Sequence, residues 1–327
     1  GLDGARRLLK EFLAYPAHGT QVIHVAGTNG KGSTCAMIDS IARACGRRTG
    51  LFTSPHLIDY RERVKVSGGE IPEEACAAML TRLREICERF ENHPTFFEIS
   101  LALAMRWFRE RECELIILET GMGGRLDATT AVPADVCVVT PVGLDHTQWL
   151  GETLEAIAAE KAGIFVTGKP VISAPQEPAA AFVLEKEANE TRAPIEFVAE
   201  PLLGYAIALP GTHQQWNAAL AVAALHKAGL PLSADTESRF DAGMRAPVKP
   251  ILTASLSLDS MWFTGLSSPP RPISPMQTMP LSRGLSRAPD RMDMTTARST
   301  AGSLTFMPPA MLTTMSELER NTPERFS

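Results

Sequence analysis

Residues 27–34, GTNGKGST, form a glycine-rich segment between an apolar run and a stretch with helical spacing. Glycines let a backbone curve so that its N–H groups surround a polyphosphate, and a following helix N-terminus adds a favourable dipole. Lys31 would reach the β- and γ-phosphates, and Ser33 or Thr34 would lie beside the phosphates and their Mg²⁺. The segment therefore predicts a nucleotide phosphate site. A glycine-rich turn without a ligand is the simpler alternative.

Glu119 ends the apolar run 114–119 and is the carboxylate best placed to hold a cation beside that phosphate site. Mg²⁺ takes hard oxygen ligands and keeps several waters, so one carboxylate with a hydroxyl and phosphate oxygens suffices. A polyphosphate brings several negative charges together, and a lysine and divalent metals relieve their repulsion. A helix-capping or salt-bridged surface glutamate is the alternative for Glu119.

Helical and strand patterns alternate over the first two thirds of the chain. The predicted helices cover 2–14, 33–45, 73–90, 97–111, 153–162 and 217–228, and the predicted strands cover 21–26, 49–53, 114–119, 135–140 and 169–174, with short β structure over 195–209. This alternation predicts an α/β fold with a doubly wound, mostly parallel sheet and ligands at the carboxyl ends of its strands. The glycine-rich segment, Ser54, Glu119 and His146 all lie where a predicted strand ends.

The composition, with 44% hydrophobic residues in 327, is that of a globular protein with room for two domains. A net charge of −5 argues against a nucleic-acid partner. No secretory signal precedes the first strand, and no apolar run approaches the roughly 18 residues of a membrane span. We therefore expect a cytoplasmic monomer without a membrane partner. The six cysteines lack metal-site spacing, and Cys35 and Cys137 are expected to be buried thiols.

From about residue 240 the composition changes. Nine of the 13 Met lie beyond that point, with eleven Pro, twelve Ser, a single Lys and no Cys, Tyr or His. Such a segment is hard to fold into a core. We expect one domain over 1–238, followed by an atypical, disordered tail over 239–327. Translation in a shifted reading frame and a natural disordered tail are the two explanations that the sequence leaves open.

The glycine-rich string resembles that of the Mur ligase superfamily and, within it, of folylpolyglutamate synthase and dihydrofolate synthase. Four further motifs follow in the order and approximate spacing of that family: TSPHL at 53–57 with ERV at 62–64, TFFE at 95–98, ETGMGGRLDAT at 119–129, and LDHTQWLG at 144–151 with EKAGI at 160–164. The resemblance covers about residues 1–235. It implies a phosphate-loop fold like the central domain of the Mur ligases.

The resemblance implies an ATP-dependent ligase that joins L-glutamate to a folate-type carboxylate through an acyl phosphate. The acceptor would be tetrahydrofolate, dihydropteroate or both. Another Mur-type amide ligase is one alternative. An ATP-binding remnant without ligase activity is the other, because the tail lacks the DxAHNP motif of the family's second domain. We therefore expect weak ligase activity at best from this chain.

The resemblance also assigns the residues of the nucleotide and metal sites. The ATP contacts that it implies are Thr28, Asn29, Gly30, Lys31, Gly32, Ser33 and, near the adenine, Asn217. It implies two Mg²⁺ ions, with Ser54 on the first, His146 on the second and Glu119 as a bridging ligand. Lys161 completes the catalytic set with Lys31, Glu119 and His146. Carbamoylation would make Lys161 carboxylate-like, which requires a neutral amine. A structural histidine, a solvated lysine and a helix N-cap are the alternatives for His146, Lys161 and Asn217.

Two segments match those that contact the pterin in dihydropteroate-binding relatives. They contribute Thr95, Phe96, Phe97, Glu98, Leu126, Asp127 and Ala128. Aromatic rings suit a flat heterocycle, and a carboxylate suits its amino-pyrimidine edge. A pair of core phenylalanines is the alternative for Phe96 and Phe97.

Overall fold

A computed structural model describes residues 1–230 and 242–245 of the chain. Its helices are α1 (Asp3–Glu11), α2 (Lys31–Ala44), α3 (Glu73–Cys87), α4 (Phe96–Glu110), α5 (Thr147–Leu150), α6 (Leu154–Ala162), α7 (Pro178–Thr191) and α8 (His213–Lys227), with 3₁₀ turns η1 (Tyr60–Arg63) and η2 (Ala128–Ala131). Its strands are β1 (Gln21–Ala26), β2 (Thr49–Phe52), β3 (Val64–Val66), β4 (Gly69–Glu70), β5 (Leu115–Glu119), β6 (Val136–Val139), β7 (Val171–Ser173) and β8 (Ile195–Phe197). The predicted tail and the domain boundary at 238/239 lie outside the described residues.

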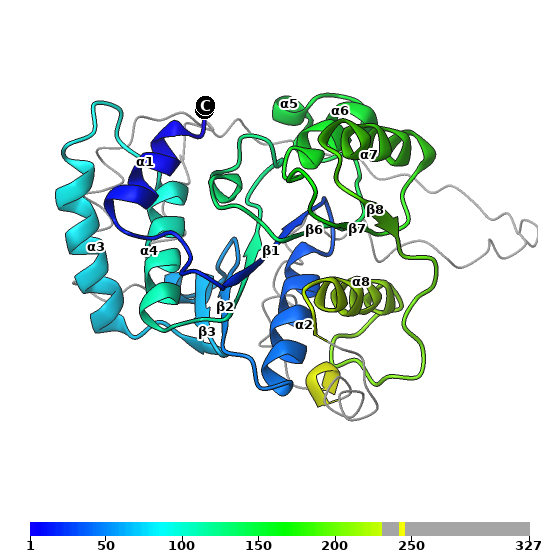
Figure 1. Ribbon diagram of the computed structural model, residues 1–327, viewed down its shortest axis with the longest axis horizontal. Coiled ribbons are helices and arrows are strands. Elements are labelled where there is room, and N and C mark those ends of the chain that lie inside the picture. Colours follow the sequence, from blue (N-terminus) through cyan, green and yellow to red (C-terminus); the bar gives the residue numbers. More distant parts are fainter. Residues whose placement is uncertain (231–241, 246–327) are drawn as a thin grey trace, which may run out of the picture.

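The eight strands form one sheet in the order β4-β3-β2-β5-β1-β6-β7-β8 (Figure 1). The pairs from β2 to β8 are parallel, and β3 and β4 are antiparallel additions at one edge. Strand β1 lies between β5 and β6, where the connections change direction across the sheet. In such sheets ligands bind outside the carboxyl ends of the strands at this point. The predicted doubly wound, mostly parallel sheet is confirmed.

Strand register brings the carboxyl ends of four strands to one edge. Val25 pairs with Glu119, Ala26 pairs with Val139, and Phe52 pairs with Leu118. The loops that follow β1, β2, β5 and β6 therefore leave the sheet side by side. These loops contain the glycine-rich segment, Ser54 and His146, and Glu119 is the last residue of β5.

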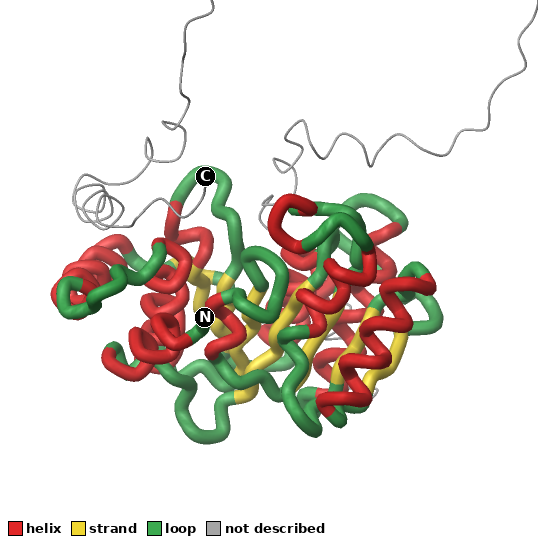
Figure 2. The backbone as a smooth tube through the Cα atoms, turned by 90° about the horizontal axis from the view of Figure 1, so that it is seen from above, coloured by secondary structure: helices red, strands yellow, loops and turns green. Residues whose placement is uncertain are grey.

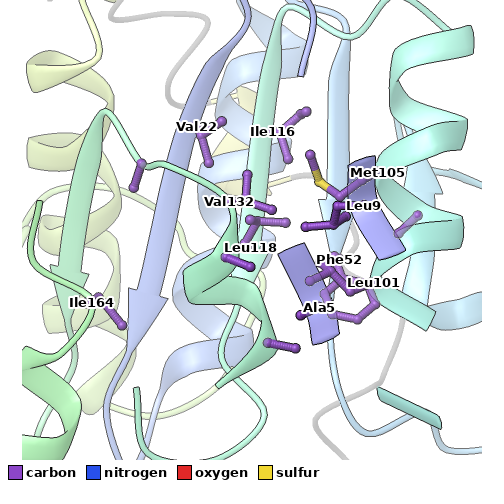
Figure 3. Close-up of a cluster of buried hydrophobic side chains, with 14 of the residues drawn as sticks. Ala5, Leu9, Val22, Phe52, Leu101, Met105, Ile116, Leu118, Val132 and Ile164 are labelled. Carbon is purple, nitrogen blue, oxygen red and sulfur yellow. The ribbon is translucent and has the colours of Figure 1, made fainter. Parts of the chain in front are cut away.

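Helices cover both faces of the sheet (Figure 2). Ile116 and Leu118 of β5 point toward the face packed by α1, α3, α4, α6 and α7, whereas Leu115 and Ile117 point toward α2 and α8. Figure 3 shows part of the first cluster, with side chains of α1 and α4 beside Phe52 and Leu118. Apolar side chains on both faces explain the uninterrupted apolar runs in the sequence.

Sequence patterns did not reveal the hairpin of β3 and β4, the short helix α5 or helix α7. The hairpin of β3 and β4 turns at Ser67 and Gly68, whose φ angles of 48° and 82° are both positive, as a tight two-residue hairpin turn requires. Its strands are too short to show a pattern. Helix α7 buries only Ala180, Leu184 and Ala188, a stripe too narrow to stand out in the sequence. The β structure expected over 195–209 is confined to β8.

Cys35 and Cys137 are buried free thiols, as predicted. Within residues 1–230 and 242–245, no helix is long and apolar enough to cross a membrane.

Replacing Leu118 with Ala should lower the free energy of unfolding by about 2–5 kcal/mol, because it leaves a cavity in a fully buried part of β5. Urea titration followed by circular dichroism measures this. Phe182→Ala is the matched control, since the Phe182 side chain is 68% exposed on α7, and it should change the free energy by less than about 0.5 kcal/mol. Equal losses in the two variants would contradict this description of the core.

Candidate active site

The glycine-rich segment connects β1 to α2, as a phosphate loop does. Gly30 precedes α2 with a φ of 86°, in the left-handed region that favours glycine. A Cβ atom there would also lie 2.6 Å from Oδ1 of Asn217. Backbone conformation and a close neighbour therefore both require glycine at position 30, and α2 directs its N-terminus into the loop.

The loop after β6 holds the phosphate loop in place. The backbone N–H groups of Thr28 and Asn29 both donate to the carbonyl of Pro141, at 3.0 and 3.3 Å. The Thr28 hydroxyl donates to the Gly143 carbonyl at 3.1 Å and accepts from the Gly143 N–H at 3.0 Å. The shape of the phosphate loop thus depends on a segment more than 100 residues away in the sequence.

Two lysines converge on one carbonyl of the phosphate loop. Lys31 Nζ donates to the Gly27 carbonyl at 3.1 Å, and Lys161 Nζ from α6 donates to the same oxygen at 2.9 Å. Lys161 is only 3% exposed, so the alternative of a solvated lysine is wrong. Burial lowers the pKa of Lys161 to about 8, and the positive charge of Lys31 is the second cause of this shift. A substantial fraction of its amine is therefore neutral near physiological pH.

Glu119 faces the same loop from β5. Its side chain is 5% exposed, and its Oε2 accepts a hydrogen bond from the Ser54 backbone N–H at 3.2 Å. A Cβ atom on Gly32 would lie 3.5 Å from Oε1, so the carboxylate points at the first turn of α2. Burial raises the pKa of Glu119 to about 7, opposed by Lys31, the Ser54 N–H and Arg63. The surface-glutamate alternative is wrong.

The donors around Glu119 fit Mg²⁺. A carboxylate beside Ser54 offers hard oxygen chemistry and faces the loop expected to carry the phosphates. Within the described part of the chain, no group of three or more His, Cys, Asp or Glu could hold a metal ion. A site built on Glu119 would therefore take most of its ligands from waters and phosphate oxygens, as Mg²⁺ commonly does.

His146 lies apart from this group. It precedes α5 with a φ of 50°, and its Nε2 lies 3.7 Å from Oδ2 of Asp145. Its side chain is about half exposed, and its described contacts are not with Ser54 or Glu119. The structure therefore brings Lys31, Lys161, Glu119 and Ser54 together but leaves His146 at the rim.

A cavity of about 850 Å³ lies beside these groups, between α1, the start of α4 and the loop after β5. Six of the seven residues predicted to contact a pterin line it: Thr95, Phe97, Glu98, Leu126, Asp127 and Ala128. Phe96 instead packs edge-on against Tyr60, with the ring centroids 5.8 Å apart. The core alternative therefore describes Phe96, whereas Phe97 faces the cavity.

Two of the carboxylates that line this cavity, Glu98 and Asp127, are held by nearby N–H and O–H groups. Oε2 of Glu98 accepts from the Thr95 N–H at 2.7 Å and the Thr95 hydroxyl at 2.9 Å, which caps α4. Oδ2 of Asp127 accepts from the N–H groups of Gly121 and Met122, both at 2.9 Å. Both side chains are thus fixed by backbone groups before any ligand binds.

A buried relay that the sequence analysis missed supports Asp127. The Thr129 hydroxyl donates its one hydrogen to Oδ1 of Asp127. Its oxygen therefore accepts from Nε2 of His24, which lies 2.7 Å away in β1. Burial lowers the pKa of His24 to about 3, so this imidazole is neutral. The relay joins the strand of the phosphate loop to the cavity wall. A histidine inside an otherwise apolar strand was the available signal.

Asn217 lies inside α8. That helix begins at His213 with Thr212 as its N-cap, so the N-cap alternative for Asn217 is wrong. Its Nδ2 donates to Oε1 of Gln214 at 2.9 Å, and Nε2 of Gln214 donates to the Ser33 hydroxyl at 3.4 Å. Asn217 thus contacts the start of α2 through Gln214. Its contact with adenine stays a prediction.

The chain is similar in sequence to known proteins. Residues 25–190, half of the chain, match the Mur ligase middle domain. The chain belongs to the Mur ligase family. It is 47% identical over 210 residues to folylpolyglutamate synthase of Arabidopsis thaliana, and 42% identical over 226 residues to dihydrofolate synthase/folylpolyglutamate synthase of Escherichia coli. These matches cover 62% and 65% of this chain but only 37% and 53% of the relatives, so the chain spans about half of their length or less.

Solved structures agree with this membership. Escherichia coli FolC in complex with DHPP and ADP has a TM-score of 0.67 and 36% identity, covering 76% of this chain and 62% of that one. An FPGS–AMPPCP–folate complex has a TM-score of 0.69 and 29% identity, covering 75% and 67%. The predicted resemblance to folylpolyglutamate and dihydrofolate synthases is confirmed.

The raised pKa of Glu119 predicts how a Glu119→Gln variant changes stability with pH in the absence of metal. Above pH 7 the folded chain carries a buried charge, which costs stability. Below about pH 4.5 the carboxyl is protonated in both the folded and the unfolded state, and the cost disappears. The variant should therefore be more stable than the wild type by about 2–3 kcal/mol at pH 8, and equally stable near pH 4.5.

Urea titrations in EDTA at both pH values measure this difference. Glu85→Gln, at an exposed position of α3, should match the wild type throughout. A Glu119→Gln variant that is less stable than the wild type at pH 8 would show that the charged carboxylate stabilises the fold.

Proposed function

We propose that this chain is the nucleotide-binding part of an ATP- and Mg²⁺-dependent ligase that adds L-glutamate to a folate-type acceptor. The acceptor would be tetrahydrofolate, dihydropteroate or both. The observation that carries the proposal is the convergence of Lys31, Lys161 and Glu119 on the phosphate loop, next to a cavity lined by Phe97 and Asp127. Relatives named for these reactions, and an FPGS complex with AMPPCP and folate, support it.

The residues of the chain fit the electrostatic demands of this reaction. The acceptor carboxylate attacks the γ-phosphate, ADP leaves, and the glutamate amine then attacks the acyl phosphate and displaces phosphate. Lys31 and the N-terminus of α2 would offset the negative charge of the phosphates. The backbone of residues 28–33 would surround them, with Asn217 toward the adenine. No step requires a side-chain nucleophile.

Two Mg²⁺ ions would supply further charge neutralisation. We propose that Ser54 and Glu119 hold the first ion and His146 contributes to the second. Glu119 is already desolvated, and a cation beside it would restore the charged form at neutral pH. His146 would have to approach from the rim of the site, on the loop that also holds Thr28.

The cavity suits the heterocycle of the acceptor. Phe97 offers a ring face, supported by Phe52 with the ring centroids 5.6 Å apart. Leu126 is 68% exposed at the cavity, where an apolar ligand would cover it. Because Glu98 and Asp127 are fixed by backbone groups, the cavity is largely formed in advance. Cytoplasmic location and a monomeric state stay predictions.

A phosphate-release assay with ATP, Mg²⁺, L-glutamate and either dihydropteroate or tetrahydrofolate tests the function. We expect release that requires both the acceptor and glutamate, and its absence in Lys31→Ala. The variant should also bind AMPPCP about 10–100-fold more weakly, because it loses a charge-assisted contact with the phosphates. Lys169→Ala is the control, since Lys169 is paired with Asp135 and distant from the loop.

The outcomes separate the alternatives. Nucleotide binding without turnover would identify an ATP-binding remnant. Turnover with amino acids other than glutamate, and without a pterin acceptor, would identify another Mur-type amide ligase. Equal AMPPCP affinity in wild type and Lys31→Ala would contradict the phosphate-loop assignment.

Lys161 is proposed to react with CO₂. Its neutral amine would attack the carbon of CO₂ and release a proton, giving a carbamate that carries a negative charge in place of a positive one. With ¹³CO₂, we expect a carbamate signal in the ¹³C NMR spectrum that grows from pH 7 to 9, because the amine titrates near pH 8. The signal should be missing in Lys161→Gln and present in Lys186→Gln, at an exposed position of α7. Identical spectra for the two variants would refute the modification.

A further inference from the structure

Arg63 is a buried cation that the proposed roles leave unexplained. It is the last residue of η1, and its backbone carbonyl accepts from the Thr53 N–H at 3.1 Å, directly before Ser54. The residue is 8% exposed. A guanidinium is rarely buried this far without a partner of opposite charge, because the loss of hydration is costly.

The described partners of Arg63 carry no negative charge. Its Nε donates to Nδ1 of His56 at 2.8 Å, and its Cζ lies 5.3 Å from the ring centroid of Phe96. Burial and the charge of Arg63 both lower the pKa of His56, so this imidazole is neutral and accepts the hydrogen bond. The nearby carboxylate that acts on Arg63 is Glu119, through electrostatic attraction rather than an ion pair in contact.

These contacts leave the terminal part of the guanidinium available. The bond to His56 uses Nε, and stacking on Phe96 restricts the plane of the group. The two Nη groups are the part of arginine that donates to carboxylates in pairs of parallel hydrogen bonds. Arg63 is therefore oriented in advance, with its charge not yet compensated by a contact.

The position of Arg63 indicates which anion it receives. On one side lie Ser54 and Glu119, beside the phosphate loop. On the other lies Phe96, between Thr95 and Phe97, which both line the cavity proposed for the acceptor. The phosphate loop already has Lys31 and the N-terminus of α2, so the need for a further cation is on the acceptor side.

We infer that Arg63, oriented by His56 and Phe96, binds the carboxylate of the acceptor and holds it for attack on the γ-phosphate. This inference rests on the proposed function and deepens it. One carboxylate oxygen forms the new O–P bond while the bond from phosphorus to the leaving ADP oxygen breaks. The other oxygen becomes the carbonyl of the acyl phosphate and stays on the guanidinium. Arg63 would thus both attract the acceptor and keep it in position between the two steps.

The test compares dihydropteroate with its carboxamide, which keeps the shape and loses the charge. Binding is measured by titration calorimetry in the presence of AMPPCP and Mg²⁺. The wild type should prefer the carboxylate about 10–100-fold, and Arg63→Gln should lose that preference. Arg63→Lys should retain part of it, because charge remains but the paired donors do not. Arg61→Gln is the matched control: Arg61 lies in the same turn but is paired with Asp59 at 2.6 Å, and its loss should leave the preference intact.

Each result decides between the inference and its alternatives. An unchanged carboxylate preference in Arg63→Gln and Arg63→Lys would overturn the inference. So would a selective loss of AMPPCP affinity with ADP affinity unchanged, which would assign Arg63 to the γ-phosphate. AMPPCP affinity equal to that of the wild type also verifies that each variant is folded. A wild type that binds AMPPCP but neither dihydropteroate nor tetrahydrofolate would contradict the proposed function itself.

Discussion

Parallel pairing of β1 with both β5 and β6 is the constraint on which the site depends. Because β1 is central, its carboxyl end has a neighbouring strand end on each side, and three loops leave the sheet together. The phosphate loop follows β1, Glu119 ends β5, and the loop after β6 supplies the hydrogen bonds to Thr28. A shift of one residue in either pairing would move Glu119 or the β6 loop away and reverse which face each side chain covers.

This arrangement buries charged side chains, which costs desolvation free energy, and hydrogen bonds to backbone groups offset part of that cost. Lys161 donates to a phosphate-loop carbonyl, Glu119 accepts from the Ser54 N–H, and Asp127 accepts from two N–H groups after β5. Each of these charged side chains is therefore hydrogen-bonded to the backbone of a loop at the carboxyl edge of the sheet. The same burial raises the pKa of Glu119 and lowers that of Lys161, which leaves both side chains able to change protonation state near neutral pH.

Two glycines allow close approaches between segments around the site. A Cβ atom on Gly30 would strike Asn217 of α8, and one on Gly163 would strike the backbone of Arg125 in the loop after β5. Glycine at position 30 thus lets the phosphate loop approach the Asn217 side chain, and glycine at position 163 lets two backbone segments approach each other directly. His24 adds a polar link between the same regions through Thr129. The loop proposed to bind phosphate and the cavity proposed for the acceptor are therefore connected through the fold rather than independent of each other.

The sequence by itself determined the features that depend on neighbours along the chain. The apolar runs predicted β1, β2, β5, β6 and β7, with β1 at the same bounds as observed. The glycine-rich string predicted a loop between a strand and a helix, where the structure has it. The motif at 95–98 predicted residues that line the cavity, because a helix start of this kind has a defined local shape. Only the tertiary structure decided how each polar side chain is used. Arg63 lay in a family motif and His24 interrupted an apolar strand, but neither pattern showed the partners of the side chain. Asn217 proved to be buried within α8, and His146 lay at the rim. The reason is physical: burial and hydrogen-bond partners come from segments up to about two hundred residues apart, and local spacing carries no record of them.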